Sequence, residues 1–142
     1  MKILTIITVS ILFFMAIFIS INKDTISGTS WVYYWDEKQG YADSLLFKDS
    51  IYMYYSYEMQ QHFYGDYYFI DEFLFLERRG EVWQYNFPKY VPDDPPQGIR
   101  QIAVITENNL QFIKAQKKKD SVWVDMDFKY NDTYIFRKLN KK

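Results

Sequence analysis

The feature that most limits the fold of this chain is a series of short runs in which two sets of side chains alternate. The runs begin after Ile26 and are separated by turn residues at spacings of about ten positions. Alternation with a period of two is typical of β-strands, and no helical period of useful length competes with it. We therefore expect an all-β domain, either a sandwich or an up-and-down barrel. The expected strands are residues 30–35, 44–47, 51–57, 63–69, 73–78, 81–87, 100–106, 110–115, 121–128 and 133–138.

The links between these runs are short, with one exception. Asp49, the pair Asp71 and Glu72, and the pair Arg79 and Gly80 each mark an expected turn between neighbouring strands, because Asp bonds back to its local backbone and Gly adopts positive φ. Residues 88–98 hold all four prolines and cannot form a central strand, because proline lacks the amide donor that a sheet requires. This segment is expected to be the one long loop.

The amino-terminal segment has a different character. Residues 3–21 carry no charge, and as a helix they would span roughly 28 Å, close to the apolar thickness of a bilayer. We interpret residues 1–22 as a signal anchor, with a cleaved signal peptide as the alternative, because bulky Phe18 and Ile19 crowd a cleavage site after Ser20. Lys2 favours a cytoplasmic amino terminus, which would place residues 23–142, one β-barrel domain, outside the cytoplasm.

Composition excludes several functions. The formal net charge is −1, so the chain lacks the broad positive field that attracts nucleic acid. It contains no cysteine, which removes thiolate catalysis, cysteine zinc sites and a lipid-modified cysteine anchor. Aromatic residues make up 21% of the chain and tyrosine alone supplies fourteen, a bias that suits pleated and half-buried surfaces. No cofactor is expected.

The aromatic residues concentrate in residues 51–77 and alternate there. In the first strand of this stretch we expect Ile51, Met53, Tyr55, Tyr57 and Met59 to face the interior and Tyr52, Tyr54, Ser56, Glu58 and Gln60 the outside. In the next strand Phe63, Gly65, Tyr67 and Phe69 are expected inside, followed by Trp83, Tyr85 and Phe87. Buried tyrosines need hydrogen-bond partners, so this interior is either a packed core with satisfied hydroxyls or an open binding cavity.

Several stretches resemble a known family. They are SGTSW at residues 27–31, the hairpin SLLFKDSIYMYY, the meander YYFIDEFLFLE, the hairpin ITENNLQFI and the closing TYIFRKL. Together they are similar to the small lipocalin-like domains of secreted and envelope proteins in Bacteroidetes-type bacteria. The resemblance implies an antiparallel up-and-down barrel of about 8–10 strands. This chain has one residue more than the Gly-x-Trp signature. By the same resemblance Trp31 would close the barrel floor and pack near Arg137.

Residues that could carry catalysis are few. His62 is the single histidine, so neither a histidine metal site nor a His-based triad is expected. Asp125 and Asp127 alternate with apolar residues in the manner of an outward strand face, although paired carboxylates can also hold calcium. The acidic residues 93–94 and the basic residues 117–119 are each interpreted as solvated, with a partner or anionic lipid as the functional alternative.

These observations predict a non-enzymatic, membrane-tethered envelope protein that binds a small apolar or amphipathic ligand inside a β-barrel. The expected ligand-binding residues are Tyr55, Tyr57, Tyr67, Phe69, Trp83 and Tyr85. The alternative is a protein-interaction module, such as an envelope assembly or immunity-type factor, which would use outward tyrosines as interface anchors. That contact surface would be Tyr52, Tyr54, Tyr64 and Tyr68. A membrane, a small ligand or a protein are the expected partners, and nucleic acid is not.

Overall fold

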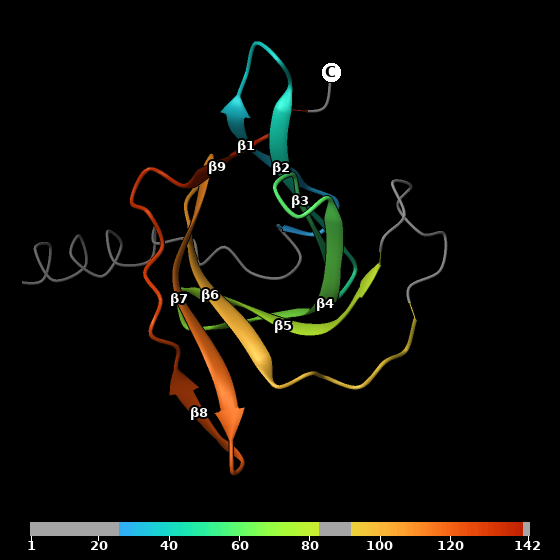
Figure 1. Cartoon of the computed structure of the whole chain (residues 1–142), viewed down its shortest axis with the longest axis vertical. Helices are drawn as coiled ribbons and strands as arrows, with labels where there is room; N and C mark the ends of the chain where they lie inside the picture. Colours follow the sequence, from blue (N-terminus) through green and yellow to red (C-terminus); the bar gives the residue numbers. More distant parts are fainter. Residues whose placement is uncertain (1–25, 83–91, 141–142) are drawn as a thin grey trace, which may run out of the picture.

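The computed structural model describes residues 26–82 and 92–140. Within these residues the chain forms nine β-strands, and Figure 1 shows them arranged as a ring with one hairpin projecting from it. The strands are β1 (Ser30–Asp36), β2 (Tyr41–Lys48), β3 (Ile51–Ser56), β4 (Gln61–Ile70), β5 (Phe73–Val82), β6 (Ile99–Ile105), β7 (Asn109–Lys119), β8 (Val122–Asp125) and β9 (Ile135–Lys138). The expected amino-terminal helix and residues 83–87 lie outside the described residues.

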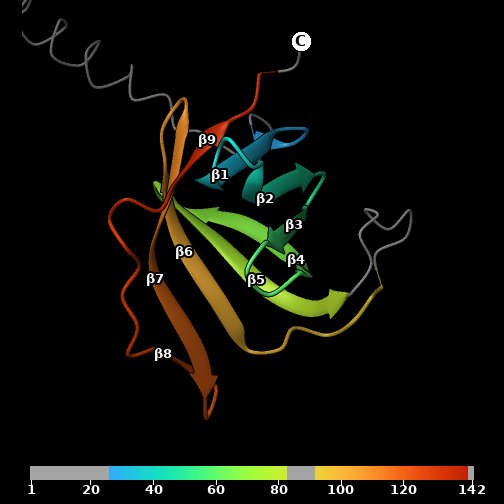
Figure 2. The same cartoon turned by 45° about the horizontal axis from the view of Figure 1, so that its top comes forward.

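Eight of the nine strands close into an antiparallel barrel. Strands β1 to β7 pair in sequence order, and β9 closes the ring by pairing with both β1 and β7. Strand β8 pairs with β7 outside the ring, and both views show this hairpin extending away from the barrel (Figures 1 and 2). The all-β up-and-down barrel is therefore confirmed. The described residues contain no helix with the length and apolar character to cross a bilayer.

The turns follow the sequence in two places and depart from it in a third. Asp49 and Asp71 have φ values of 54° and 52° in the expected turns after β2 and β4, where Asp tolerates the left-handed region. The turn expected at Arg79 and Gly80 is wrong, because β5 runs through both residues. Gly80 lies under the ring of Tyr64, and a Cβ there would come within 2.5 Å of the Tyr64 hydroxyl oxygen. This glycine makes room for a ring.

One end of the barrel is closed by a packed floor. Its side chains come from every part of the ring and have almost no exposed surface; they include Trp31, Leu45, Phe47, Leu74, Phe112 and Phe136. Trp31 is 2% exposed, and its indole Nε1 donates to Thr29 Oγ1 at 2.9 Å. The tryptophan therefore belongs to the floor, as expected.

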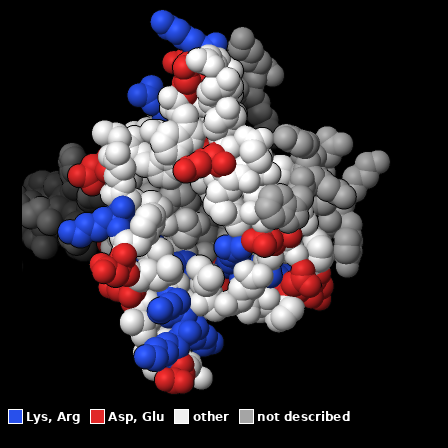
Figure 3. Space-filling model, viewed as in Figure 1, with Lys and Arg blue, Asp and Glu red and all other residues white. Residues whose placement is uncertain are grey.

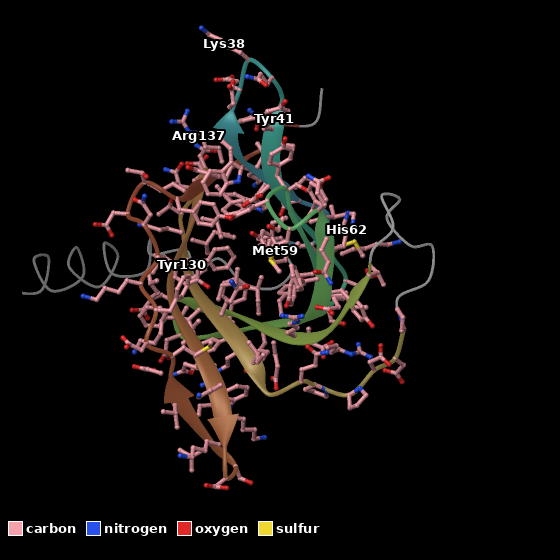
Figure 4. All side chains as sticks on the ribbon, viewed as in Figure 1. Lys38, Tyr41, Met59, His62, Tyr130 and Arg137 are labelled. Atoms are coloured by element: carbon pink, nitrogen blue, oxygen red, sulfur yellow. The ribbon has the colours of Figure 1, made fainter. Side chains whose placement is uncertain are left out.

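The partner expected for Trp31 is wrong. The Nζ atom of Lys138, not Arg137, lies over the Trp31 ring at 5.8 Å from its centroid. Trp31 pairs with Lys138 across β1 and β9, whereas Arg137 pairs with Val32. Because successive side chains of a strand point to opposite faces, Arg137 is exposed, and Figure 4 shows it outside the wall.

The barrel wall is irregular between β7 and β9. Strand β7 pairs with β9 only at residues 109–111 and with β8 only at residues 116–119. The stretch between them is covered by residues 126–134, whose Met126 amide donates to the carbonyl of Ala115 at 2.9 Å. The Tyr130 ring stacks on Phe112 at 5.4 Å. The strands predicted at residues 121–128 and 133–138 are therefore shorter than expected and do not pair with each other. The segment between them forms part of the barrel wall.

Candidate functional site

The barrel contains a cavity of about 740 Å³ above the floor. It is open at the end where β1, β3, β5 and β7 finish and where β2, β4 and β6 begin. Its walls are mainly aromatic and aliphatic, with Tyr33, Tyr52, Tyr54, Phe63, Leu76 and Tyr134 among them. An eight-stranded barrel is just wide enough to be filled by side chains or to hold one small ligand. This volume lies within the range of small-molecule sites.

The β3 residues that line the cavity are not the ones that the sequence predicted. Tyr52, Tyr54 and Ser56 face the cavity, while Tyr55 and Tyr57 do not line it. Tyr55 contacts His62 at 4.8 Å between ring centroids, and Tyr57 stacks on Tyr41 at 4.6 Å. The predicted inward face of this strand is therefore wrong.

The register of the neighbouring strands explains this choice of face. Tyr54 pairs with Leu45 on one side and with Phe63 on the other, so its face continues into an apolar surface. Tyr55 pairs with Ser44 and His62, which are polar. Both faces of β3 are aromatic in the sequence, and the polarity of its neighbours decides which one is buried.

The other predicted lining residues belong to the floor or lie outside the described range. Tyr67 and Phe69 in β4 do face inward, but they contribute to the floor and not to the cavity wall. The Tyr67 hydroxyl donates to the carbonyl of Asp49 at 2.5 Å, which satisfies it. Trp83 and Tyr85 lie outside the described residues. A ligand-binding role for all six predicted residues stays a prediction.

A hydrogen-bonded cluster in the wall is built around Asp43, which is 2% exposed. The amide of Tyr57 donates to its Oδ1 at 2.7 Å, the Tyr54 hydroxyl donates to its Oδ2 at 3.2 Å, and the Tyr134 hydroxyl donates to the same oxygen. The two hydroxyl oxygens lie 2.9 Å apart. This cluster ties together β2, the end of β3 and the segment before β9.

The surroundings of this cluster hold its tyrosines neutral. Burial, followed by the charge of Asp43, raises the pKa of Tyr54 far above its usual value. Burial and the neighbouring Tyr54 hydroxyl raise the pKa of Tyr134 in the same way. Because all three side chains bond to one another, they form a fixed wall and not a proton-transfer group with a free partner.

Further polar side chains line the cavity, namely Ser56, Glu58, Arg78, Arg100, Gln101, Lys129 and Asn131. The amide Nε2 of Gln101 donates to the Tyr130 hydroxyl at 2.6 Å, which fixes the irregular wall against β6. Arg78 projects from β5, and its guanidinium carbon lies 4.3 Å from the centroid of the Phe63 ring. Sequence reasoning missed Asp43 and Arg78, although each is a charged residue in an alternating row with inward apolar residues, such as Leu45 or Leu76.

The rim of the cavity carries large exposed apolar side chains next to the exposed polar residues Glu58, Lys129 and Asn131. Trp35, Met59 and Phe128 line it and are 51%, 55% and 52% exposed. In Figure 4 Met59 lies near the middle of the ring of strands, and Tyr130 lies toward the β6 and β7 side. Large apolar side chains gathered at the mouth of a cavity are a common sign of a binding site.

The outward tyrosine surface that the alternative function requires is not present. Tyr52 and Tyr54 face the cavity, and Tyr64 is 2% exposed with its hydroxyl donating to the Asp94 carboxylate. Tyr68 stacks on Phe75 at 5.4 Å and is only partly exposed. The contact surface predicted from these four residues is therefore wrong.

Two of the acidic residues considered in the sequence, Asp93 and Asp125, make structural contacts. Asp93 pairs with Arg79, and Asp125 accepts a hydrogen bond from Gln116 and pairs with Lys114 at 2.9 Å. Across residues 26–82 and 92–140, no three His, Asp or Glu side chains gather closely enough to hold a metal ion. Lys117, Lys118 and Lys119 lie near the tip of the β7–β8 hairpin, where Figure 3 shows basic side chains at the lower end of the molecule.

Comparisons of the chain with protein-family models, curated proteins and solved structures gave no significant match. The resemblance to small lipocalin-like domains therefore stays a prediction, and the function has to be argued from the cavity itself.

Proposed function

We propose that the protein is a non-enzymatic envelope protein that binds a small apolar or amphipathic molecule inside its barrel. The observation that carries this proposal is the cavity of about 740 Å³ with aromatic walls and large exposed apolar side chains at its rim. Burying an apolar molecule in such a cavity is favourable by about 25 cal/mol for each Å² of apolar surface removed from water. Polar groups of the wall such as Asp43 and Gln101 are hydrogen-bonded to neighbouring tyrosines and would orient a ligand without dominating its affinity.

A membrane tether fits the same proposal. Residues 3–21 are uncharged and long enough to span a bilayer as a helix, which would hold the barrel close to a source of apolar molecules. The apolar rim residues Trp35, Met59 and Phe128 would contact such a molecule as it passes between a lipid phase and the cavity. The domain would be extracytoplasmic and attached to the cell membrane by a single span.

The test is whether the purified protein retains a small molecule. The full-length chain is expressed in a bacterial host, purified in mild detergent and measured by native mass spectrometry before and after denaturation. The expected result is a stoichiometric additional mass that is lost on unfolding. The matched variant is Ala115→Phe, because Ala115 lines the cavity and a ring at this position would occupy ligand space. The additional mass should disappear in the variant.

Two results would contradict the proposal. An additional mass that persists in a folded Ala115→Phe protein would show binding outside the cavity. The second result is a protein that carries no additional mass and also fails to bind every member of a panel of apolar and amphipathic fluorescent probes. This result would contradict the proposed binding of a small molecule.

A further inference from the structure

Arg78 occupies an unusual position for a charged residue. It lies in β5 opposite Gly65, and Gly65 lies opposite Tyr52 in β3, so the three residues form one row across the inner face. Gly65 has no side chain because β4 and β5 approach closely here, and a Cβ would come within 1.9 Å of the carbonyl oxygen of Glu77. The side chain of Arg78 lines the cavity.

The guanidinium uses only part of its bonding capacity within the described residues. Its Nη2 atom pairs with the carboxylate of Glu81, and its carbon lies over the Phe63 ring. Its Nε atom is buried, and the described part of the chain offers it no acceptor. A buried donor without an acceptor costs about 1–3 kcal/mol. A ligand that supplies this acceptor would recover that cost.

The carboxylates of Asp43 and Glu81 do not accept a hydrogen bond from this Nε atom. Both oxygens of Asp43 already accept hydrogen bonds from Tyr54, Tyr57 and Tyr134. Glu81 is bound through Nη2 and is 42% exposed at its side chain. Arginine remains protonated under all ordinary conditions and presents its donors in a planar fork that matches a carboxylate. A carboxylate entering the cavity would meet a positive charge with donors to spare.

Tyr52 adds a second polar group in the same row. Its pKa is raised by burial and lowered by the charge of Arg78, so the phenol remains a neutral donor that experiences this charge. Leu76 and Ile99 also line this part of the cavity. A polar end at Arg78 and apolar walls around it suit an amphipathic molecule.

On the basis of the proposed function, we infer that the ligand is an amphipathic carboxylate whose head group binds Arg78 inside the barrel. The Nε atom and the remaining guanidinium hydrogens donate to the two carboxylate oxygens, and Tyr52 lies beside them. The apolar tail lies along the tyrosine wall toward the rim at Trp35 and Phe128. Charge-assisted hydrogen bonds of this kind are about twice as strong as neutral ones.

The experiment compares a charged probe with its neutral methyl ester. Dansyl-labelled undecanoic acid and its methyl ester are titrated at neutral pH into the full-length protein in nanodiscs of zwitterionic lipid, and empty nanodiscs supply the background. We expect the acid to bind about tenfold or more tightly than the ester. The preference should fall to about twofold or less in Arg78→Met and remain in Arg137→Met, which removes the same charge from an exposed position.

The outcomes separate this inference from the function on which it rests. Equal affinity of the acid and the ester for the wild-type protein would overturn the inference that the ligand is a carboxylate, and the proposed binding in the cavity would still stand. A preference for the acid that persists in Arg78→Met would overturn Arg78 as the anchor. Binding of neither probe would contradict both. If Arg78→Met does not fold, Arg78→Lys replaces it, since lysine keeps the charge and loses the planar set of donors. The ratio of the affinity for the acid to the affinity for the ester should then fall to half of its wild-type value or less.

Discussion

The Asp43 cluster predicts how the barrel responds to loss of one buried carboxylate. In Asp43→Ala the amide of Tyr57 loses the acceptor that it reaches at 2.7 Å, and the hydroxyls of Tyr54 and Tyr134 lose their shared oxygen. A buried amide without a partner costs about 1–3 kcal/mol. The two hydroxyls keep each other at 2.9 Å, so their loss is smaller, about 1 kcal/mol in total. We expect the free energy of unfolding to fall by about 3 kcal/mol.

The size of this effect can be separated from the loss of charge. Asp43→Asn keeps one oxygen for the Tyr57 amide, and the tyrosine hydroxyls can rotate to accept from the new amide group. We therefore expect a loss of only about 1 kcal/mol for Asn. For a domain of this size, 1 kcal/mol corresponds to a shift of about 4 °C in melting temperature. Asp43→Ala should then melt about 12 °C lower and Asp43→Asn about 4 °C lower.

The assay is thermal unfolding of the full-length protein in mild detergent, followed by near-ultraviolet circular dichroism, which reports on the packing of the rings. Tyr34→Phe is the matched control, because Tyr34 is 45% exposed and lies outside the cluster. An Asp43→Ala protein that melts with the wild type would refute the reasoning. So would an Asn variant as damaged as the Ala variant, since the Tyr57 amide would then not be the main contributor.

Four further outcomes are expected. Burial raises the pKa of Tyr130 to about 12, so folding favours the neutral phenol. The free energy of unfolding should therefore fall as pH rises from about 10 to about 12, and denaturant melts at alkaline pH would measure this. Burial lowers the pKa of His62, so the free energy of unfolding should fall as pH drops below about 6.5, the ordinary pKa of histidine, and the His62→Phe variant should not show this fall. Gly65→Ala should lose about 2 kcal/mol or more in urea melts, because its Cβ would meet the Glu77 carbonyl at 1.9 Å. Glu81→Gln should bind the fluorescent acid a fewfold more tightly, because the carboxylate paired with Arg78 repels a second anion.

The strands could be predicted from sequence because the alternation of side chains depends only on the local backbone conformation of each strand. The positions of β1, β3, β4 and β6 follow from it to within a few residues. Alternation could not decide which face of β3 is buried, because Tyr54 and Tyr55 are equally aromatic and the choice depends on Phe63 and His62 in the next strand. It also could not show that β9 pairs with β7 and β1 while β8 is left outside. Pairing between distant strands is a property of the closed ring.

The candidate site was partly hidden for a similar reason. The sequence prediction relied on large aromatic residues and left out the charged residues that line the cavity, among them Asp43 and Arg78, each a single charged residue in an apolar row. A charged side chain on an inward face is costly unless it has partners. Such a residue is therefore a better pointer to a site than another ring. Arg79 is its immediate neighbour and points outward to Asp66 and Asp93, so only the strand's face distinguishes the two arginines.

Small inward side chains contribute to the space inside the cavity. Toward the floor they are large, as at Phe47, Phe112 and Phe136, whereas nearer the mouth they include Ala115 and Ser56. Inserting a ring into a close-packed core usually costs about 1–3 kcal/mol. Ala115→Phe should cost less than about 1 kcal/mol, because the ring enters existing space and buries apolar surface. Urea melts of the variant test this independently of any ligand, and a loss above about 2 kcal/mol would mean that this part of the barrel is already filled.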